Sequence, residues 1–511
     1  MEEQAVDARN GWPAIFGFAC AQCFLYAVLF VGDPSSFSPS ADGRLDLLDV
    51  LVFLAAAFLL VWLSPSGFRV RLFSNRFVAT CSFLPVLGLG MRVAGALSGH
   101  PELAAAEALV EGALMGFPAG VMLCAWGRVI GRFPIERSVP VVFIGSALGS
   151  ALGFAVSVLP IEGAVLALQV LLVPSFLLMP AAGGRVGSRP HFRNEGGRED
   201  AAPAEEASGP EGSRSRPRVE MSAEASSLSM RILAGTCVYG LAAGLAESTL
   251  AAPAVAEAST DTFVLLLFAL YCLAAIQLFG GSPLLSMRKI LPSRDGSTPE
   301  DAGPLDGSYR LAVLLMLTGF LLVPTLKLFG IAGESVIFAG YMGVTTVLVS
   351  LFLVMGRISR CDSARAFAQG FTALFFGEIV GVVAGSVVGA VPGDVASTPL
   401  VALAGVAVIV AYLFLFTDRD LESLSHVVEE TDLFEEACER IAADAALSKR
   451  ESEILPLALR GRTSERIAAE FFISKNTVDT HMRRIYAKCG VHGRQELIDL
   501  GERVERSLRG R

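Results

Sequence analysis

The feature that most constrains this chain is a series of apolar runs, each close to twenty residues long. A helix rises about 1.5 Å per residue, so about twenty residues cross the roughly 30 Å hydrocarbon core of a bilayer. Hydrophobic side chains make up 53% of the chain and charged ones only 18%, which disfavours a purely soluble protein. We therefore expect an all-α fold with twelve transmembrane helices in a lipid bilayer. The expected spans are 12–32, 46–63, 77–97, 103–126, 139–159, 161–180, 231–252, 262–281, 310–330, 335–356, 366–390 and 398–416.

The spans fall into two groups of six, separated by a polar stretch. The first group occupies residues 1–181 and the second residues 230–417. Residues 182–229 between them are rich in Gly, Pro, Ser, Arg and Glu, a composition that cannot bury enough apolar surface to fold. The sequence thus predicts two six-helix membrane halves joined by a flexible linker.

The distribution of Lys and Arg among the short loops predicts the orientation, because cytoplasmic loops retain basic residues and translocated loops do not. Four loops, after the second, fourth, eighth and tenth spans, carry three basic residues each. The loops after the seventh and eleventh spans carry none, and those after the first and third carry one each, Arg44 and Arg92. We expect a multi-pass protein of the bacterial cell membrane with both termini and residues 182–229 in the cytosol. The basic residues of the four loops are Arg69, Arg71 and Arg76, then Arg128, Arg132 and Arg137, then Arg288, Lys289 and Arg294, and last Arg357, Arg360 and Arg365.

Six spans, a long cytosolic loop and six further spans, with both termini inside, resemble the major facilitator superfamily. That family carries a Gly-x-x-x-Asp-Arg-x-Gly-Arg-Arg loop between its second and third helices. The corresponding segment here is SPSGFRVRLFSNR, residues 64–76, which has arginines but lacks the Asp and the glycine spacing. The resemblance implies a major-facilitator-like 6+6 bundle and leaves open whether the bundle transports anything.

Four carboxylates fall inside the expected spans: Glu107, Glu111, Glu247 and Glu378. A charged residue deep in a span costs about 2.5 to 3.5 kcal/mol on insertion scales, so it usually faces a cavity or a partner. Glu107 and Glu111 share one helix face, being four residues apart. The resemblance implies that Glu111 and Glu247 face each other across a central cavity. These residues either form an acidic pocket for a small cationic or protonatable ligand, or are protonated or bonded to groups of neighbouring helices.

Charge is distributed unevenly near the C-terminus, although the whole chain has a formal net charge of −9. Residues 418–446 contain ten Asp or Glu and two Arg, whereas residues 447–511 contain fourteen Lys or Arg and nine Asp or Glu. A net-positive module therefore follows a net-negative linker helix, and the module is the part to which a polyanion would bind. The acidic segment either serves as a connecting or dimerising helix, or pairs with the basic module and holds it off DNA.

The boundary signals in residues 447–500 predict four short helices. An S-x-x-E capping box opens the first helix at Ser448 and Glu451. Either Thr463 or Ser464 caps the second helix, and Ser474 caps a third that runs to about residue 488 and is closed by a glycine. A helix, a tight turn and a second helix with basic residues form the geometry that lays a recognition helix in the major groove of double-stranded DNA.

This segment resembles the LuxR/NarL (GerE-type) DNA-binding domain over its whole length. The motifs L-S-x-R-E-x-E-I-L, G-x-T, I-S-x-x-T-V-x-x-H and K-x-G-V stand in the family's register between residues 447 and 494. The resemblance implies that Val478, Ile485 and Val491 are core residues and that the third helix contacts DNA. The residues expected to contact DNA are Lys475, Asn476, Thr477, Asp479, Thr480, His481, Arg483, Arg484 and Lys488.

These contacts divide between base edges and the phosphate backbone. Asp479 and Arg483 stand where the family's residues reach base edges, and the guanidinium can read guanine or clamp phosphate. Asp479 departs from the basic or small residue usual in the family, and it would either accept a hydrogen bond from a cytosine amine or orient an arginine. His481 fits a packed surface residue as well as a phosphate contact. The candidates for backbone contacts are Lys475, Thr477, His481 and Lys488.

Together these features predict a membrane-bound one-component transcriptional regulator. The bundle would act as the sensor, and the C-terminal domain would bind promoter DNA as a homodimer, because the family reads paired half-sites. The alternative is a secondary transporter with a regulatory helix-turn-helix tail. An enzyme is not expected, because the sequence offers no metal-ligand cluster and no phosphate-binding Gly-rich loop, and no cofactor is implied. A domain that has lost DNA binding is a further alternative, against which the cations of the third helix argue.

Overall fold

The computed structural model of the protein consists of two compact units, Met1–Glu422 and Ser423–Arg511. Both units are helical, and the described residues include no strand, so the expected all-α fold class is confirmed. Of the expected linker 182–229, residues 183–217 lie outside the described residues, whereas residues 218–229 are helical, contrary to the expectation of a flexible segment. Residues 418–432 and 435 of the acidic segment also lie outside the described residues. The structure describes residues 2–27, 29, 43–98, 104–133, 135–159, 163, 166–167, 170–182, 218–250, 259–279, 304–328, 333–358, 362–389, 397–415, 433–434, 436–471 and 473–509.

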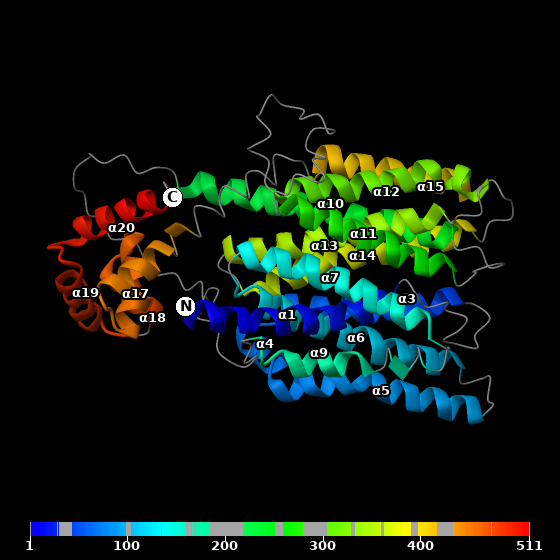
Figure 1. The fold of residues 1–511 in the computed structure, drawn as a ribbon, viewed down its shortest axis with the longest axis horizontal. Coiled ribbons are helices and arrows are strands. Elements are labelled where there is room, and N and C mark those ends of the chain that lie inside the picture. Colours follow the sequence, from blue (N-terminus) through cyan, green and yellow to red (C-terminus); the bar gives the residue numbers. More distant parts are fainter. Residues whose placement is uncertain are drawn as a thin grey trace, which may run out of the picture. The chain divides into compact units, whose positions relative to one another are not determined.

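The first unit is a bundle of long helices that run roughly side by side (Figure 1). Its first half contains α1 (Glu2–Tyr26), α3 (Gly43–Leu63), α4 (Ser66–Leu72), α5 (Asn75–Ser98), α6 (Ala104–Ile130), α7 (Ile135–Ser157) and α9 (Leu172–Leu178). Its second half contains α10 (Arg218–Leu250), α11 (Ser259–Phe279), α12 (Pro304–Leu328), α13 (Gly333–Ile358), α14 (Ser363–Gly389), α15 (Ser397–Val410) and η5 (Ala411–Leu415).

A helix overlaps each of the twelve expected spans. Within the described residues, α6, α7, α10, α12, α13 and α14 are long and apolar enough to cross a membrane. Three shorter apolar helices lie in α3, in α11 and across α15 and η5. The expected bundle of apolar helices, several of them long enough to cross a membrane, is therefore confirmed.

Glycines let helices within one half pack at backbone contact. In the second half α10 lies along α14. A Cβ atom added at Gly240 or Gly244 of α10 would overlap backbone atoms of α14, including the carbonyl oxygen of Glu378. Gly377 and Gly381 of α14 face α10 in the same way. Such small-residue interfaces permit close approach of membrane helices. The α10–α14 pair therefore fixes the backbone on which Glu378 stands.

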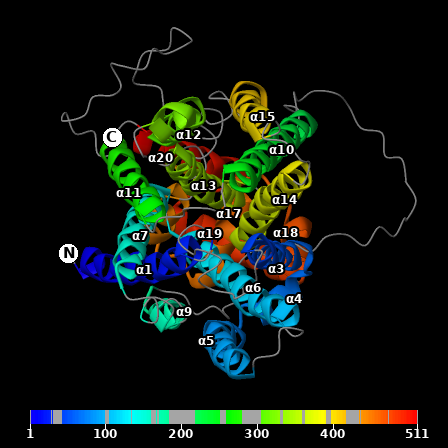
Figure 2. The same cartoon turned by 90° about the vertical axis from the view of Figure 1, so that its right-hand side faces the viewer.

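The two halves meet mainly through α14 and α11. Figure 2 shows the first half, blue to cyan, on one side of the bundle and the second half, green to yellow, on the other. α14 packs against α3 and α6, and α11 packs against α7. Phe58 of α3 stacks on Phe371 and Phe375 of α14, with ring centroids 5.5 and 5.6 Å apart. Stacked aromatic rings contribute about 0.5–1.5 kcal/mol beyond their buried area, so this seam holds the halves together.

The second unit is a small helical domain around one apolar core. After a helix at 436–444 come α17 (Lys449–Leu459), α18 (Ser464–Phe471), α19 (Lys475–Cys489) and α20 (Arg494–Arg509). Val478, Ile485 and Val491 are buried in the core, as expected. Cys438 and Ile441 of the helix at 436–444 belong to the same core. The packed domain therefore begins before residue 447 and includes part of the segment expected to be an acidic linker.

Candidate nucleic-acid interface and membrane-domain sites

α18, a tight turn and α19 form the helix-turn-helix of the second unit. The hydroxyl of Thr463 accepts a hydrogen bond from the backbone N–H of Arg466 at 3.3 Å, so Thr463, one of two candidates, caps α18. Ser474 caps α19, accepting from the N–H of Thr477 at 3.1 Å. At the other end Gly490 adopts φ 66°, the left-handed conformation that ends helices and favours glycine. These caps set the length and the start of the expected recognition helix.

The outer surface of α19 carries most of the residues expected to contact DNA. Its inner face buries Val478, Met482 and Ile485 against the core. Asp479 and His481 are half-buried at the flanks. The exposed residues are Lys475, Asn476, Thr477, Thr480, Arg483, Arg484 and Lys488. The helix thus presents a polar and cationic surface along its whole length.

Carboxylates surround the only cation in the first turn of α19. Lys475 forms an ion pair with Glu465 of α18. A hydrogen bond and the charge of Glu465 raise the pKa of Lys475, and the charge of Asp479 acts in the same direction. Arg483 and Arg484 lie in the second half of the helix, where both are exposed. The attraction for a polyanion is therefore greatest toward the C-terminal half of α19.

Lys488 has intramolecular partners that the sequence did not reveal. Its ammonium donates to the carboxylate of Glu451 at 2.7 Å and to the backbone carbonyl of Ala446 at 3.1 Å. Glu451 is 2% exposed and also accepts from the N–H of Ser448 at 2.7 Å, completing the expected capping box. The hydrogen bond from Lys488 and the backbone bond from Ser448 lower the pKa of Glu451 to about 2. Glu451 therefore stays ionised and holds Lys488.

The uncharged residues of α19 are partly committed to the helix itself. The hydroxyl of Thr480 donates to the carbonyl of Asn476 at 2.8 Å, and that of Thr477 shares a hydrogen bond with Ser474. The Nδ1 atom of His481 is buried without a hydrogen-bond partner among the described residues. A phosphate contact by His481 would therefore use the other ring nitrogen.

In the first unit, which we call the membrane unit, a buried carboxylate lies between α13 and α14. Glu378 is 1% exposed and accepts a hydrogen bond from the hydroxyl of Tyr341 at 2.8 Å. Glu247 of α10 is half-buried, and its charge also acts on Tyr341. Two of the four expected acids therefore act on one tyrosine, Glu378 through a hydrogen bond and Glu247 through its charge. Glu111 is half-buried on α6, and the side chain of Glu107 lies outside the described residues.

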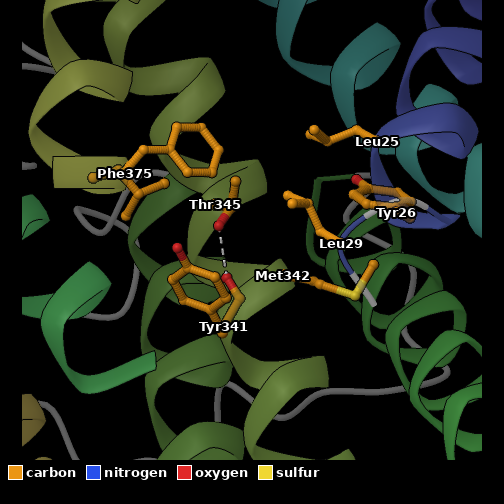
Figure 3. A pocket seen from close by; sticks show the side chains of 8 residues that line it. Leu25, Tyr26, Leu29, Tyr341, Met342, Thr345 and Phe375 are labelled. Carbon is orange, nitrogen blue, oxygen red and sulfur yellow. Dashed lines mark hydrogen bonds between the residues drawn. The ribbon is translucent and has the colours of Figure 1, made fainter. Parts of the chain in front are cut away.

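Tyr341 also lines a small apolar pocket between the halves (Figure 3). α1 and the residues just after it contribute Leu25, Tyr26 and Leu29 to one wall. α13 and α14 contribute the opposite wall, made of Tyr341, Met342, Thr345, Leu374 and Phe375. Among the described residues no three His, Cys, Asp or Glu side chains gather as metal ligands. The lining of this pocket is apolar, and its volume of about 10 Å³ is enough only for a water-sized group.

A cluster of three charged side chains joins the halves at the end of the bundle where α14 begins. Arg69 of α4 and Arg128 of α6 each lie 3.7 Å from a carboxylate oxygen of Asp362, which immediately precedes α14. Asp362 also accepts a hydrogen bond from the N–H of Ala364 at 3.2 Å, and so caps α14. All three charged side chains are at most 11% exposed. We call this cluster the Asp362 clasp. The sequence did not predict it, because its members are distant in the chain.

Part of the second unit matches a family of bacterial regulatory proteins. Residues 445–500 match the family described as bacterial regulatory proteins, luxR family. The chain is 36% identical over 91 residues to the uncharacterized response regulatory protein YgeK of Escherichia coli (strain K12), covering 17% of this chain and 62% of YgeK. It is 43% identical over 53 residues to the oxygen regulatory protein NreC of Staphylococcus aureus (strain JH9), covering 10% of this chain and 24% of NreC. The chain thus spans less than two thirds of these relatives.

The C-terminal domain is accordingly a LuxR-type helix-turn-helix domain. Most of the chain also aligns with two solved transporter structures, at TM-scores below 0.5. A bacterial homologue of the iron transporter ferroportin in an outward-facing state aligns with a TM-score of 0.49 at 13% identity, over 82% of this chain and 99% of that one. The major facilitator superfamily transporter FucP in the outward conformation aligns with a TM-score of 0.43 at 13% identity, over 79% and 98%.

Proposed function

We propose that this protein is a membrane-bound, one-component transcriptional regulator whose α19 helix binds promoter DNA in the major groove. The observation that carries the proposal is the LuxR-type domain with Arg483 and Arg484 exposed on α19. Exposed guanidiniums on a recognition helix bind phosphate or read guanine bidentately. Asp479, beside them on the same helix, would accept from a cytosine amine or orient an arginine.

The membrane bundle is proposed to act as the sensor. Support comes from the buried Glu378–Tyr341 pair and from the apolar pocket that α1, α13 and α14 line together. A small cationic or protonatable ligand would be attracted by Glu378 and Glu247 and would contact both halves. Because short loops rich in Lys and Arg favour the cytoplasmic side, we propose that both termini lie in the cytosol of a bacterial cell, where the domain binds DNA as a homodimer on paired half-sites.

A secondary transporter with a regulatory tail is the second candidate. It is favoured by the pocket between the two halves, since such a position allows a ligand to be released on either side of the membrane. In this case substrate accumulation would collapse on replacement of Glu111 or Glu247, and loss of DNA binding would leave accumulation unchanged.

Chromatin capture of the full-length protein tests the proposal. Arg483→Glu replaces an attractive charge by a repulsive one at the groove and should abolish promoter retention. Arg503→Glu makes the same charge change on the exposed surface of α20 and should retain the promoters. An unchanged footprint for Arg483→Glu refutes the assignment of α19. Absence of any salt-sensitive DNA affinity in the wild-type chain refutes the regulator and leaves the transporter.

A further inference from the structure

We propose that Lys488 is a positioning residue that ties the DNA-reading helix α19 to the segment through which the domain is tethered. This inference rests on the proposed function, because it concerns how α19 is held for DNA. It differs from the role that the sequence predicts for Lys488, which is a contact with the phosphate backbone. Three elements converge on the ammonium group of Lys488: the end of the helix at 436–444, the start of α17 and the last turn of α19.

The helix at 436–444 ends in a tight hinge immediately before α17. Ala446 adopts φ 46°, in the left-handed region that favours glycine. The N–H of Leu447 donates to the carbonyl of Ala442 at 2.9 Å, and that of Ala446 donates to Ala443 at 3.1 Å. This pattern is a Schellman motif, which reverses the chain at a helix C-terminus. Since Ser448 caps α17 one residue later, the hinge joins the two helices without a flexible connection.

The ammonium of Lys488 contacts both sides of this hinge. It donates to the carbonyl oxygen of Ala446, which lies at the negative end of the incoming helix. It also donates to Glu451, the capping-box residue of α17, so one cation satisfies a helix C-terminus and a buried carboxylate. Two of the three ammonium donors are thereby used inside the protein. Ala446 and Glu451 precede Lys488 by 42 and 37 positions in the chain, so both hydrogen bonds are tertiary constraints.

The pair is also asymmetric in exposure. The Lys488 side chain is 39% exposed, whereas the Glu451 side chain is 3% exposed. Loss of Lys488 would leave a buried carboxylate without this countercharge, which destabilises the surrounding structure more than loss of the pair as a whole. Lys488 therefore holds the C-terminal end of α19 against the hinge. The helix at 436–444 lies on the side of the domain's sequence that leads to the membrane unit. A displacement of this helix would be transmitted to α19 through the hydrogen bonds of Lys488.

Binding measurements on four variants of the full chain in nanodiscs test the proposal. The probe is a duplex that the wild-type chain selects from a random library, with a scrambled duplex as the non-specific reference. Lys488→Met removes the cation, Glu451→Gln keeps the capping acceptor without the charge, and the third variant combines both changes. Arg484→Met is the matched control, because it removes an exposed cation from the same helix.

For a positioning residue, Lys488→Met should weaken binding to the selected duplex by about tenfold or more while leaving the salt slope as in the wild type. Adding Glu451→Gln should recover most of that loss, because no buried charge then lacks its partner. Arg484→Met, as a phosphate contact, should lower the salt slope by about 0.9 with both duplexes. If Lys488→Met alone does not fold, the salt slope of the double variant is compared with that of the wild type. An unchanged slope supports the proposal, and a slope lowered as in Arg484→Met contradicts it.

The proposal is overturned if Lys488→Met lowers the salt slope as Arg484→Met does and Glu451→Gln fails to restore affinity. Lys488 would then be a phosphate ligand. Failure of the proposed function gives a different result: the wild-type chain then selects no duplex from the library. A wild-type chain that binds DNA, together with a rescued double variant, supports both.

Discussion

Replacing Asp362 by Asn should loosen the two halves of the membrane unit. The substitution keeps the side-chain acceptor that caps α14 and nearly the same volume, but it removes the charge between Arg69 and Arg128. At 3.7 Å and an effective dielectric constant of about 20, each ion pair has a Coulomb energy of about 4 kcal/mol. Desolvation offsets much of that energy, and breaking a buried pair from one side typically costs about 3–5 kcal/mol. We expect a loss of roughly 3 kcal/mol, because Asn retains its hydrogen bonds.

The measurement is thermal unfolding in detergent, followed by tryptophan fluorescence with Trp12 and Trp62 replaced by Phe, so that the signal comes from Trp126, which is fully buried and donates a hydrogen bond to Ser175. At roughly 2 °C for each kcal/mol in a chain of this size, the midpoint of Asp362→Asn should fall by about 6 °C. Arg132→Gln is the control. Arg132 follows α6, the helix that carries Arg128; its side chain is exposed, and its charge repels that of Arg128. Adding Arg128→Met to Asp362→Asn should recover part of the loss. A midpoint within about 1 °C of the wild type, or an equal fall in the control, would refute the reasoning.

Three further outcomes follow from the geometry. The pKa of Glu451 is about 2 in the folded domain against an ordinary 4.5, so its stabilisation is present above pH 4.5 and is lost as the pH falls toward 2. Because the ammonium of Lys488 is partly exposed, solvent screening limits the loss of stability to about 1–2 kcal/mol. Urea unfolding of residues 423–511 at decreasing pH should show this loss in the wild type and not in Glu451→Gln. Gly244→Ala should destabilise the bundle by about 1–3 kcal/mol, because its Cβ would overlap the backbone of α14, whereas Gly88→Ala, with 3.8 Å to Leu114, should not; equal unfolding midpoints would contradict this. Asp479→Asn should strengthen binding to scrambled DNA and, if the carboxylate accepts from cytosine, weaken discrimination at that base by about 1–3 kcal/mol; unchanged binding to both duplexes in a filter assay would exclude a role for Asp479.

The sequence alone determined those features that depend on neighbours in the chain. The length and apolar character of each span are local properties, so hydropathy was sufficient to predict the helices. The caps at Ser448 and Ser474 are also local, because each side chain bonds to an N–H three residues away. The family motifs similarly identified α19 and its buried face.

Only the tertiary structure decided the partners of the charged residues. Lys488 meets Glu451, and Asp362 meets Arg69 and Arg128, across separations of 37 or more residues that no local pattern encodes. The same holds for Glu378, which bonds to Tyr341 of the neighbouring helix. A charged side chain excluded from water is stabilised by whichever opposite charge or donor the packing of helices brings within a few ångströms. That packing depends on the whole chain, whereas helix formation depends on a few adjacent residues.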